Sequence, residues 1–426
     1  MRTDKVRIAE SKFFTYVKNA GLYFASSLFV AIVGVILNPL LAMNLSQEDY
    51  AILGYYSSFN FLLTPLLHFC TLTYYSRQYF FLPEEKRKVL GDTILLTMNM
   101  IGLISLIVFT FVFYMIHKRI GGHIPFIPYA VLTFVQTYVV NNVTFYLTKM
   151  RIQRKAKAYA TFSILQCLVT NALVILFVVY YKAGALGKLY AMLISTVIFA
   201  MVAFHKSLIK WRIDSNMLKS ALKFGMPLTV SALLWYCLSG IDRFFLGQLG
   251  DIGKLGVYNV AVSVAAYMQI FYTTLSNTFE PDIYQAIAIS NRRKTLAIVI
   301  TIIGIVIIFN AFFIACAPFL MRILTAGRYM ESVPYTRILA LSNITMACYY
   351  MVVRLIVGMG YVKGELMVRI VGAFMSVLIF WLLIKYYTFN GAAWGQVISF
   401  ALLSLIGLIY LKIRKIKVKH NDISGK

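Results

Sequence analysis

The chain has 426 residues, of which 60% are hydrophobic and 13% charged, and its 41 lysines and arginines outnumber 15 aspartates and glutamates to give a net charge of +26. Such a basic excess would suit a nucleic-acid-binding protein, but the basic residues stand just beyond long apolar stretches, where anionic membrane headgroups would meet them. Nucleic acid is therefore not an expected partner, and the composition predicts a membrane protein.

Twelve apolar stretches follow one another along the chain, and nearly all are long enough to cross a bilayer. A hydrocarbon core of about 30 Å requires about 20 apolar residues in a helix. We therefore expect an all-α integral membrane protein with twelve transmembrane helices. In chain order the predicted spans are 20–43, 51–75, 90–116, 126–148, 159–181, 186–205, 225–249, 256–279, 295–320, 335–357, 366–386 and 391–412.

Lysines and arginines are crowded into alternate connections, and this asymmetry predicts the orientation of the chain. The two terminal segments and the even-numbered connections hold 30 of these residues, whereas the odd-numbered connections hold 9. Positively charged connections stay on the cytoplasmic side during insertion. Both termini are therefore expected in the cytoplasm.

The sequence also repeats itself weakly at about half its length, so that six spans correspond to six. The run GALG at 184–187, before the sixth span, matches GAAWG at 391–395, before the twelfth. A parallel repeat of this kind predicts two pseudo-symmetric six-helix bundles around a central cavity. The expected division is an N-terminal bundle at 1–205, an amphipathic cytoplasmic linker at 206–224, a C-terminal bundle at 225–412 and a basic cytoplasmic tail at 413–426.

The linker at 206–224 places apolar residues and lysines on opposite faces at helical spacing. We expect an interfacial helix with residues such as Trp211 among the acyl chains and its basic residues at the headgroups. A regulatory surface is the alternative.

Signatures of catalysis are missing from the sequence. No GxxxxGK[ST] loop, HExxH motif or paired CxxC occurs, and no two acidic residues lie close together within a span. The five cysteines all fall inside apolar spans and are expected to be reduced packing residues. The chain is therefore not expected to be an enzyme or to bind a metal or cofactor.

Four charged or titratable residues within spans are candidates for substrate binding. An uncompensated charge near the centre of a helix costs about 2.5–3.5 kcal/mol on insertion scales, so these side chains should face a cavity or one another. Asp242 and Arg243 fall in the outer third of the seventh span, Arg354 near the cytoplasmic end of the tenth, and His68 in the inner half of the second. The structural alternatives are a local ion pair, a snorkelling arginine and a neutral histidine held by a neighbouring helix.

Amide side chains within the spans offer hydrogen bonds without charge, as a sugar-lined cavity would require. The same residue types also hold transmembrane helices together, so each of them has a structural alternative. The amide candidates are Asn60, Asn141, Asn142, Asn259 and Gln269.

The most specific wording lies at the seventh and eighth spans, in residues 221–285. This run begins with KFG-x-P, continues with IDRFFLG and GVY, and closes with F-x-P. It resembles the second-half signature of bacterial polysaccharide flippases, which belong to the multidrug, oligosaccharidyl-lipid and polysaccharide exporter superfamily; the similarity extends more loosely over nearly the whole chain. The matching residues are Lys223, Gly225, Pro227, Asp242, Arg243, Gly247, Gly256, Tyr258 and Pro281.

The resemblance implies a transporter that moves an undecaprenyl-pyrophosphate-linked oligosaccharide from the inner to the outer leaflet of the bacterial inner membrane by alternating access. Its product would serve lipopolysaccharide O-antigen, capsule or another exopolysaccharide. The implied partners are this lipid, the surrounding membrane lipids and polysaccharide polymerase machinery. Proton or sodium movement, the membrane potential or consumption of the product outside would each supply the driving force.

Four alternatives remain open from the sequence, one of which is a purely structural membrane protein, although that function gives no reason for the repeated halves. A cation-coupled multidrug exporter would share the architecture. Such an exporter is expected to have carboxylates within its bundles, and this chain has almost none away from the span ends. The lipid precursor flippase for peptidoglycan commonly has more than twelve spans. A membrane-bound polysaccharide polymerase or ligase is expected to carry a large periplasmic loop, whereas every outer connection of this chain is short.

Overall fold

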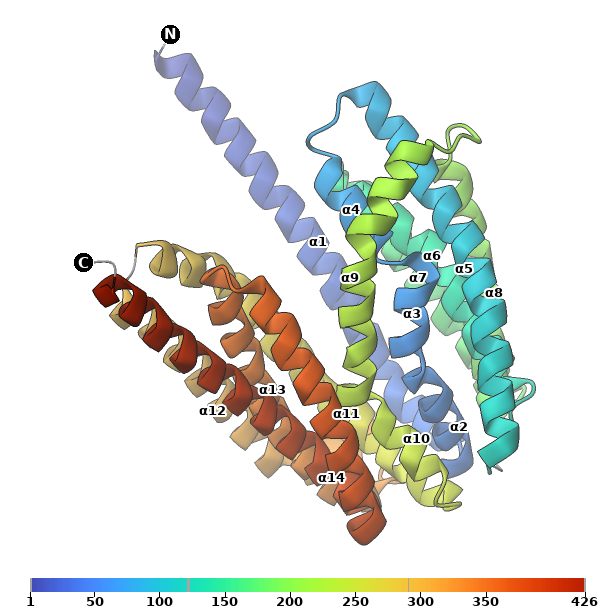
Figure 1. The fold of residues 1–426 in the computed structure, drawn as a ribbon. Coiled ribbons are helices and arrows are strands. Elements are labelled where there is room, and N and C mark those ends of the chain that lie inside the picture. Colours follow the sequence, from blue (N-terminus) through green and yellow to red (C-terminus); the bar gives the residue numbers. More distant parts are fainter. Residues whose placement is uncertain (1, 121–122, 290, 425–426) are drawn as a thin grey trace. The chain divides into compact units, whose positions relative to one another are not determined.

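The computed structural model describes residues 2–120, 123–289 and 291–424, and every regular element in those ranges is a helix (Figure 1). Side chains are described from residue 21 to residue 414, apart from 121, 122, 277, 281, 288, 290 and 362, so the side chain of Pro281 lies outside the described part. The first helices are α1 (Arg2–Asn44), α2 (Gln47–Ser58), α3 (Asn60–His68), α4 (Thr71–Gln78), α5 (Glu84–Ile120), α6 (Tyr129–Ile152), α7 (Ala156–Val174), the π-helix η1 (Ile175–Tyr180) and α8 (Gly184–Ser207). The others are α9 (Ser215–Ser239), α10 (Ile241–Gly247), α11 (Ile252–Ala288), α12 (Arg292–Leu324), the 3₁₀-helix η2 (Met330–Ser332), α13 (Val333–Gly358) and α14 (Val362–Ser424).

Nine helical stretches within the described ranges are long and apolar enough to cross a membrane, which agrees with a multi-pass membrane protein. They match nine of the twelve predicted spans to within one residue and hold only the first part of the seventh, 225–239. The longest stretch holds the last two spans on either side of Thr388, where the backbone leaves the helix (φ 49°, ψ −123°). The stretches are Gly21–Asn44, Glu84–Ile120, Ala156–Tyr180, Gly184–Ser207, Ser215–Ser239, Ile252–Glu280, Arg292–Leu324, Met330–Gly358 and Lys363–Arg414.

The second predicted span is divided among three helices, α2, α3 and α4. Phe69 and Cys70 adopt left-handed backbone angles (φ 45° and 48°), so no continuous helix runs through this point. The Nδ1 atom of His68 accepts a hydrogen bond from the Cys70 backbone N–H at 3.0 Å. Gly225 of α9 packs against this break so closely that a β-carbon there would overlap the Phe69 carbonyl oxygen.

The seventh predicted span is likewise divided, into α9 and α10. Gly240 separates the two helices with φ −137° and ψ −26°. A β-carbon at Gly240 would lie 2.6 Å from the ring of Tyr236 and 3.1 Å from the Ser58 carbonyl oxygen. The tight packing around this glycine therefore leaves no room for a side chain at the break.

Contacts within the chain define two compact units whose boundaries differ from the predicted division at the linker. Unit 1 comprises 1–45, 62–121 and 125–230, and unit 2 comprises 46–61, 122–124 and 231–426. The segment 46–61, which contains α2, is thus grouped with the C-terminal helices, and the whole of the predicted linker is grouped with the N-terminal helices. Spatial packing rather than chain order sets these boundaries.

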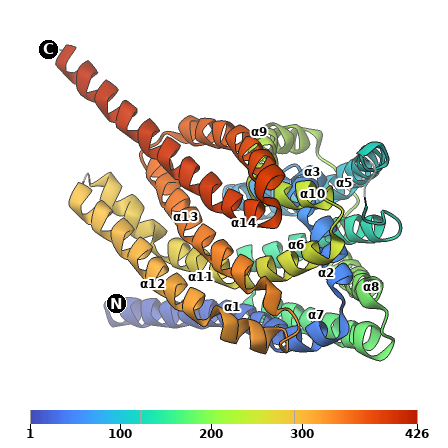
Figure 2. The ribbon, with the colours of Figure 1, turned by 90° about the horizontal axis from the view of Figure 1, so that it is seen from below.

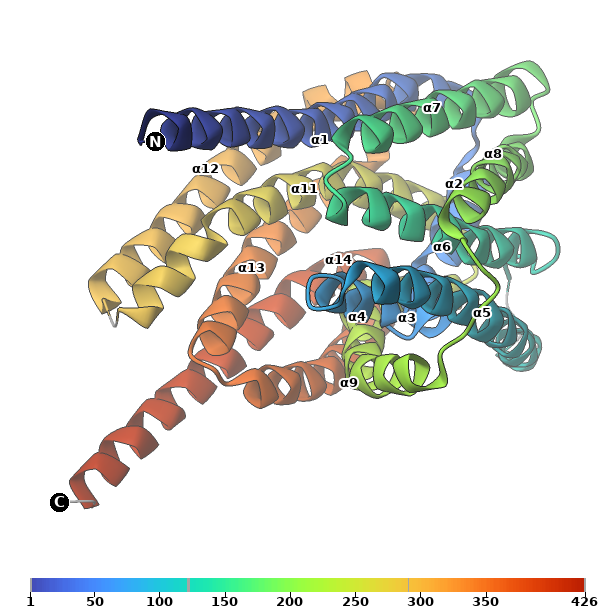
Figure 3. The same cartoon turned by 90° about the horizontal axis from the view of Figure 1, so that it is seen from above.

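Unit 1 is built from helix pairs that are mostly distant in sequence. Helix α1 runs beside α7, and α6 packs against α5 and α8 (Figure 3). One apolar cluster joins α4, α5 and α9 through buried residues that include Tyr75, Ile94 and Ala221. A second joins α6, α7 and α8 through Tyr146, Phe162 and Ala203.

The linker is not the single amphipathic helix that its sequence predicts. Helix α8 ends at Ser207, α9 begins at Ser215, and the segment between them is irregular. The Asp92 carboxylate of α5 accepts hydrogen bonds from the backbone N–H groups of Ile209 (2.8 Å) and Lys210 (3.0 Å), which supply partners that a helix would otherwise provide. Trp211 remains 78% exposed, as an interfacial position requires.

Unit 2 is organised around α11. Helices α2, α12 and α13 all pack against α11, while α14 packs against α13 and α10 (Figure 2). One apolar cluster of this unit includes Leu238, Tyr272, Tyr349 and Phe400, which come from four different helices. The unit therefore has a core of its own.

The predicted repeat appears in the backbone. Arg154 and Gly360 both have positive φ angles (56° and 82°), and so do Lys182 and Thr388 (50° and 49°); each pair is separated by 206 residues. Helices α2 and α11 begin 205 residues apart, and α7 and α14 begin 206 residues apart. The two halves of the sequence therefore share several helix starts and breaks, whereas the breaks at Phe69–Cys70 and at Gly240 have no counterpart in the continuous helices α11 and α1.

Candidate functional site

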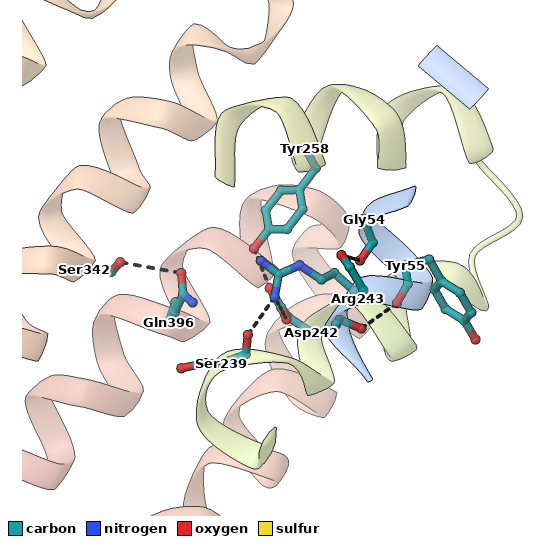
Figure 4. A network of polar contacts seen from close by, with 10 residues as sticks. Gly54, Tyr55, Ser239, Asp242, Arg243, Tyr258, Ser342 and Gln396 are labelled. Atoms are coloured by element: carbon teal, nitrogen blue, oxygen red, sulfur yellow. Dashed lines mark hydrogen bonds and ion pairs between the residues drawn. The ribbon is translucent and has the colours of Figure 1, made fainter. Parts of the chain in front are cut away.

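Asp242 and Arg243 lie in a buried network within unit 2 (Figure 4). The Tyr258 hydroxyl of α11 donates a hydrogen bond to Oδ2 of Asp242 at 2.8 Å, and Nη1 of Arg243 lies 3.4 Å from Oδ1. The same Nη1 donates to the Ser239 carbonyl oxygen at 2.6 Å. Asp242 is 0% exposed and Arg243 6%, so each charge is compensated inside the protein.

The positions of these two charges follow from the break at Gly240. Arg243 bonds to the last residue of α9, where the carbonyl groups lack helical partners and the helix dipole is negative. Asp242 lies in the first turn of α10, where the dipole is positive. Each charge therefore sits at a helix end of opposite sign.

Glycines bring α2 into close contact with α10 and α11 beside this network. A β-carbon at Gly256 would overlap the Gln47 carbonyl oxygen, and one at Gly54 would overlap the Asn259 side chain. The Asn259 Nδ2 atom donates to the backbone carbonyls of Tyr50 (3.3 Å) and Ala51 (3.4 Å). Gly256 belongs to the sequence signature at 221–285. This part of the signature therefore forms the contact between α2 and α11.

Arg354 joins α13 to α11 elsewhere in unit 2. Its Nε atom donates to Oγ of Ser276 at 2.8 Å, and its Nη1 atom pairs with Glu280. The other two candidates of this unit, Asn60 at the start of α3 and Gln269 in α11, are half-buried. The structure thus brings Asp242 and Arg243 into one network, whereas Arg354 belongs to another.

Unit 1 holds the other three candidates. The amides of Asn142 and Asn99 exchange two hydrogen bonds of 2.8 and 3.0 Å and join α6 to α5. The buried Nδ2 atom of Asn141 has no hydrogen-bond partner among the described residues. His68 is occupied at Nδ1 by the Cys70 backbone. Asn142 therefore holds two helices together, as the structural alternative predicts.

Several bonded acidic residues were absent from the sequence-derived candidates, among them Asp92 and Glu365. Asp92 holds the linker, and Glu365 pairs with Arg369 at 2.5 Å one helical turn away in α14. The spacing of Glu365 and Arg369 is an i,i+4 signal that was present in the sequence. Asp92 gave no such signal because its partners are backbone groups 117 and 118 residues away.

A surface cavity of about 650 Å³ lies at the end of α12 and contains none of the candidate residues. Its lining includes Arg322, Gly327, Arg328 and Met330. The buried network around Asp242 is therefore distinct from this cavity.

Residues 16–281, from α1 to the signature's closing proline in α11, match the protein family described as "Polysaccharide biosynthesis protein". The chain belongs to this family. The family resemblance recognised from the span-seven motif is thereby confirmed.

Two solved transporter structures have a fold similar to that of this chain. An inward-facing multidrug resistance MATE family transporter of the MOP superfamily matches with a TM-score of 0.68 at 17% identity, covering 93% of this chain and 96% of that one. The lipid II flippase MurJ in an inward closed conformation also matches with a TM-score of 0.68, at 15% identity, covering 92% and 87%. This member of the polysaccharide biosynthesis family therefore has the fold of MATE and MurJ transporters.

A curated relative covers most of the chain as well. An uncharacterized membrane protein of Methanocaldococcus jannaschii is 21% identical over 357 residues, which is 79% of this chain and 84% of the relative. The chain is thus a multi-pass membrane protein of a polysaccharide biosynthesis family with a transporter fold.

Proposed function

We propose that this protein is a flippase that moves lipid-linked oligosaccharide repeat units from the inner to the outer leaflet of the bacterial inner membrane. The observation that carries the proposal is the match of residues 16–281 to the polysaccharide biosynthesis family in a chain that has a transporter fold. The products would enter O-antigen, capsule or another surface polysaccharide. Undecaprenyl diphosphate is the proposed lipid carrier, and a polymerase is the proposed recipient.

The physical need for such a protein follows from the substrate. An unpaired hydroxyl costs several kcal/mol in an apolar medium, so a free oligosaccharide headgroup does not cross the bilayer at a useful rate. A hydrated path between two bundles would shelter the sugars while the prenyl chain stays in lipid. In our proposal the bundles alternate access to this path, with proton or sodium movement as the candidate driving force.

The multidrug exporter is the main competing function, and the buried carboxylates weigh against it. An exporter of organic cations needs acidic groups that can receive the cation. Asp92 and Asp242 are the buried acidic residues of the described side chains, and both already bind groups of the protein. We therefore propose that the transported substrate is not an organic cation bound by a buried carboxylate, and that the chain has no catalytic activity.

Deleting the protein in its host gives the direct test. We expect lipid-linked repeat units to accumulate on the cytoplasmic leaflet of the inner membrane, where membrane-impermeant glycosidases cannot reach them in intact spheroplasts. Accumulation on the outer leaflet would contradict the flippase and support a polymerase or ligase. Unchanged lipid-linked sugars together with increased sensitivity to cationic drugs would support the exporter.

The proposed topology has twelve spans with both termini in the cytoplasm. Alkaline phosphatase and green fluorescent protein fusions at residues 124, 182, 250 and 327 should report the periplasm, and fusions at residues 154, 210 and 360 should report the cytoplasm. The reverse pattern would overturn the assigned orientation.

A further inference from the structure

Two arginines of unit 2 occupy matching surroundings. Arg354 of α13 pairs with Glu280 and donates to the Ser276 hydroxyl at 2.8 Å. Arg369 of α14 pairs with Glu365 at 2.5 Å and donates to the Ser231 hydroxyl at 2.9 Å. Each guanidinium thus has one carboxylate and one serine as partners.

Tyr350 connects the two surroundings. It precedes Arg354 by four residues, so both side chains lie on the same face of α13. Ser231, the serine partner of Arg369, likewise precedes Trp235 by four residues in α9. The Tyr350 ring contacts the rings of Trp235 and Tyr272, with centroids 5.9 and 5.8 Å apart. The two charged groups therefore flank one cluster of aromatic rings.

These ion pairs are partly open rather than sealed in the core. The exposed fractions are 12% for the Arg354 side chain and 21% for that of Arg369, while Glu280 retains 36%. Well-packed apolar residues often stabilise a protein as much as a buried ion pair does. Packing alone therefore gives no reason for two arginine–carboxylate pairs at this place.

The two arginine–glutamate pairs have the chemistry of a binding site for an anionic ligand. A guanidinium presents paired N–H groups in a plane that suits a carboxylate and a phosphate equally well. A carboxylate that is bound to arginine can thus hold the position of a phosphate group until the phosphate arrives. Aromatic rings beside such a group offer flat apolar surfaces to a sugar ring.

We propose that Arg354 and Arg369 bind the diphosphate of a polyprenyl diphosphate-linked sugar, and that Glu280 and Glu365 are the counterions that neutralise the two arginines when no diphosphate is bound. This inference rests on the proposed function and specifies the part of the substrate that unit 2 recognises. The carboxylates compete with the ligand for the guanidinium groups. Removing a carboxylate charge should therefore strengthen binding, whereas removing a guanidinium should weaken it.

The test uses the purified full chain in detergent and geranylgeranyl diphosphate as the probe, with affinity measured by isothermal titration calorimetry. Geranylgeraniol and inorganic pyrophosphate are the two comparison ligands, which separate prenyl recognition from free-anion binding. We expect the diphosphate lipid to bind at least tenfold more tightly than either comparison ligand. Equal affinity for geranylgeraniol would overturn the proposal.

Variants then assign the binding to these residues. Arg354→Gln and Arg369→Gln should each weaken binding at least tenfold, while Glu280→Gln and Glu365→Gln should tighten it severalfold. Arg322→Gln is the matched control, because this exposed arginine at the end of α12 lies outside the cluster and should leave the affinity unchanged. Weakening by Glu280→Gln as large as that by Arg354→Gln would contradict the counterion role.

A conservative variant and a flipping assay separate the loss of the site from misfolding and from a wrong function. Arg354→Lys retains the charge but not the planar pair of donors, so it should fold normally and still bind less tightly than the parent. If wild-type protein flips lipid-linked sugar in vesicles but the arginine variants bind diphosphate normally, the site is wrong and the function stands. If diphosphate binding follows the predicted order but no flipping occurs, the site stands and the function is wrong.

Discussion

The backbone of Gly256 in α11 lies against the Gln47 carbonyl oxygen in α2 with no space for a β-carbon. This contact fixes the α2 segment to the helices of unit 2. The pairing joins residues from opposite halves of the sequence, and it explains why a glycine of the family signature stands at this point.

Replacing Gly256 with alanine should destabilise the protein. The new methyl group would have to displace backbone atoms, and overpacking of this kind costs about 1–3 kcal/mol or more. Gly304→Ala in α12 is the control, since nothing lies within 4 Å of a β-carbon there, and its higher helix propensity should leave stability equal or greater. Thermal unfolding in detergent, followed by size-exclusion fluorescence, compares the two variants; equal melting temperatures would contradict the close contact.

The Asp242–Arg243 pair should respond non-additively to mutation. Asp242→Asn leaves a buried guanidinium without its counterion, and Arg243→Gln leaves a buried carboxylate; breaking such a pair costs about 3–5 kcal/mol. The double variant removes both charges and should be less destabilised than the sum of the single variants. Melting temperatures that simply add would show that the two residues act independently.

Tyr258→Phe tests the hydroxyl that binds the Asp242 carboxylate. Loss of a hydrogen bond to a charged group should cost about 1.5–3 kcal/mol, because the apolar ring cannot replace the donor. Tyr335→Phe is a suitable control, since its ring packs against Tyr258 at 6.0 Å but does not contribute to this hydrogen bond. The thermal midpoint should fall for Tyr258→Phe and stay close to the parent value for Tyr335→Phe.

The linker should be released when Asp92 loses its charge. Asp92→Asn weakens two hydrogen bonds to the 209 and 210 backbone, each contributing about 1.5–3 kcal/mol, so local opening becomes at least about tenfold more frequent. Limited trypsin digestion should then cut faster after Lys210 or Arg212. Glu84→Gln, a change at an exposed residue of the same helix, should leave the cleavage rate unchanged, and an equally fast cut there would show a general loss of stability.

The protein's thermal stability should fall at low pH, in part because Asp251 at the start of α11 becomes protonated. The Lys254 backbone N–H donates to Asp251 Oδ1 at 3.0 Å and its ammonium lies 3.1 Å from Oδ2, which together lower the pKa of Asp251. Because the folded-state pKa is below the unfolded one, the stabilisation is complete above the ordinary aspartate pKa and is lost as pH falls through the folded-state value. Melting temperatures from pH 6 to pH 3 should fall further for the parent than for Asp251→Asn; parallel curves would contradict the prediction.

The sequence predicted most of the helical spans, because a long apolar run depends only on local hydrophobicity. Residues 90–116 and 295–320 lie inside α5 and α12 as continuous apolar runs. The breaks at Gly240 and at Phe69–Cys70 were not predicted, since hydrophobicity does not record a left-handed residue or a close approach of two helices. Span length could thus be inferred from composition, but the local course of the backbone could not.

The sequence singled out two charges of the Asp242 network, while the part of these residues in substrate binding stays a prediction. Asp242 and Arg243 were identified because charges are rare in apolar spans, and the structure brings them together. Tyr258 and Ser231 gave no signal as polar partners, because a hydroxyl is common in any span and the partners of Ser231 and Tyr258 lie 138 and 16 residues away. Knowledge of which helices meet was required to find them.

Because α2 is grouped with the C-terminal helices, the gene cannot be divided at the linker into two self-sufficient fragments. A cut between α8 and α9 would leave α2 on the N-terminal fragment without the helices that it packs against. The C-terminal fragment would then lack the α2 residues that contact Gly256 and Asn259. Co-expressed fragments would have to find each other before either could finish folding.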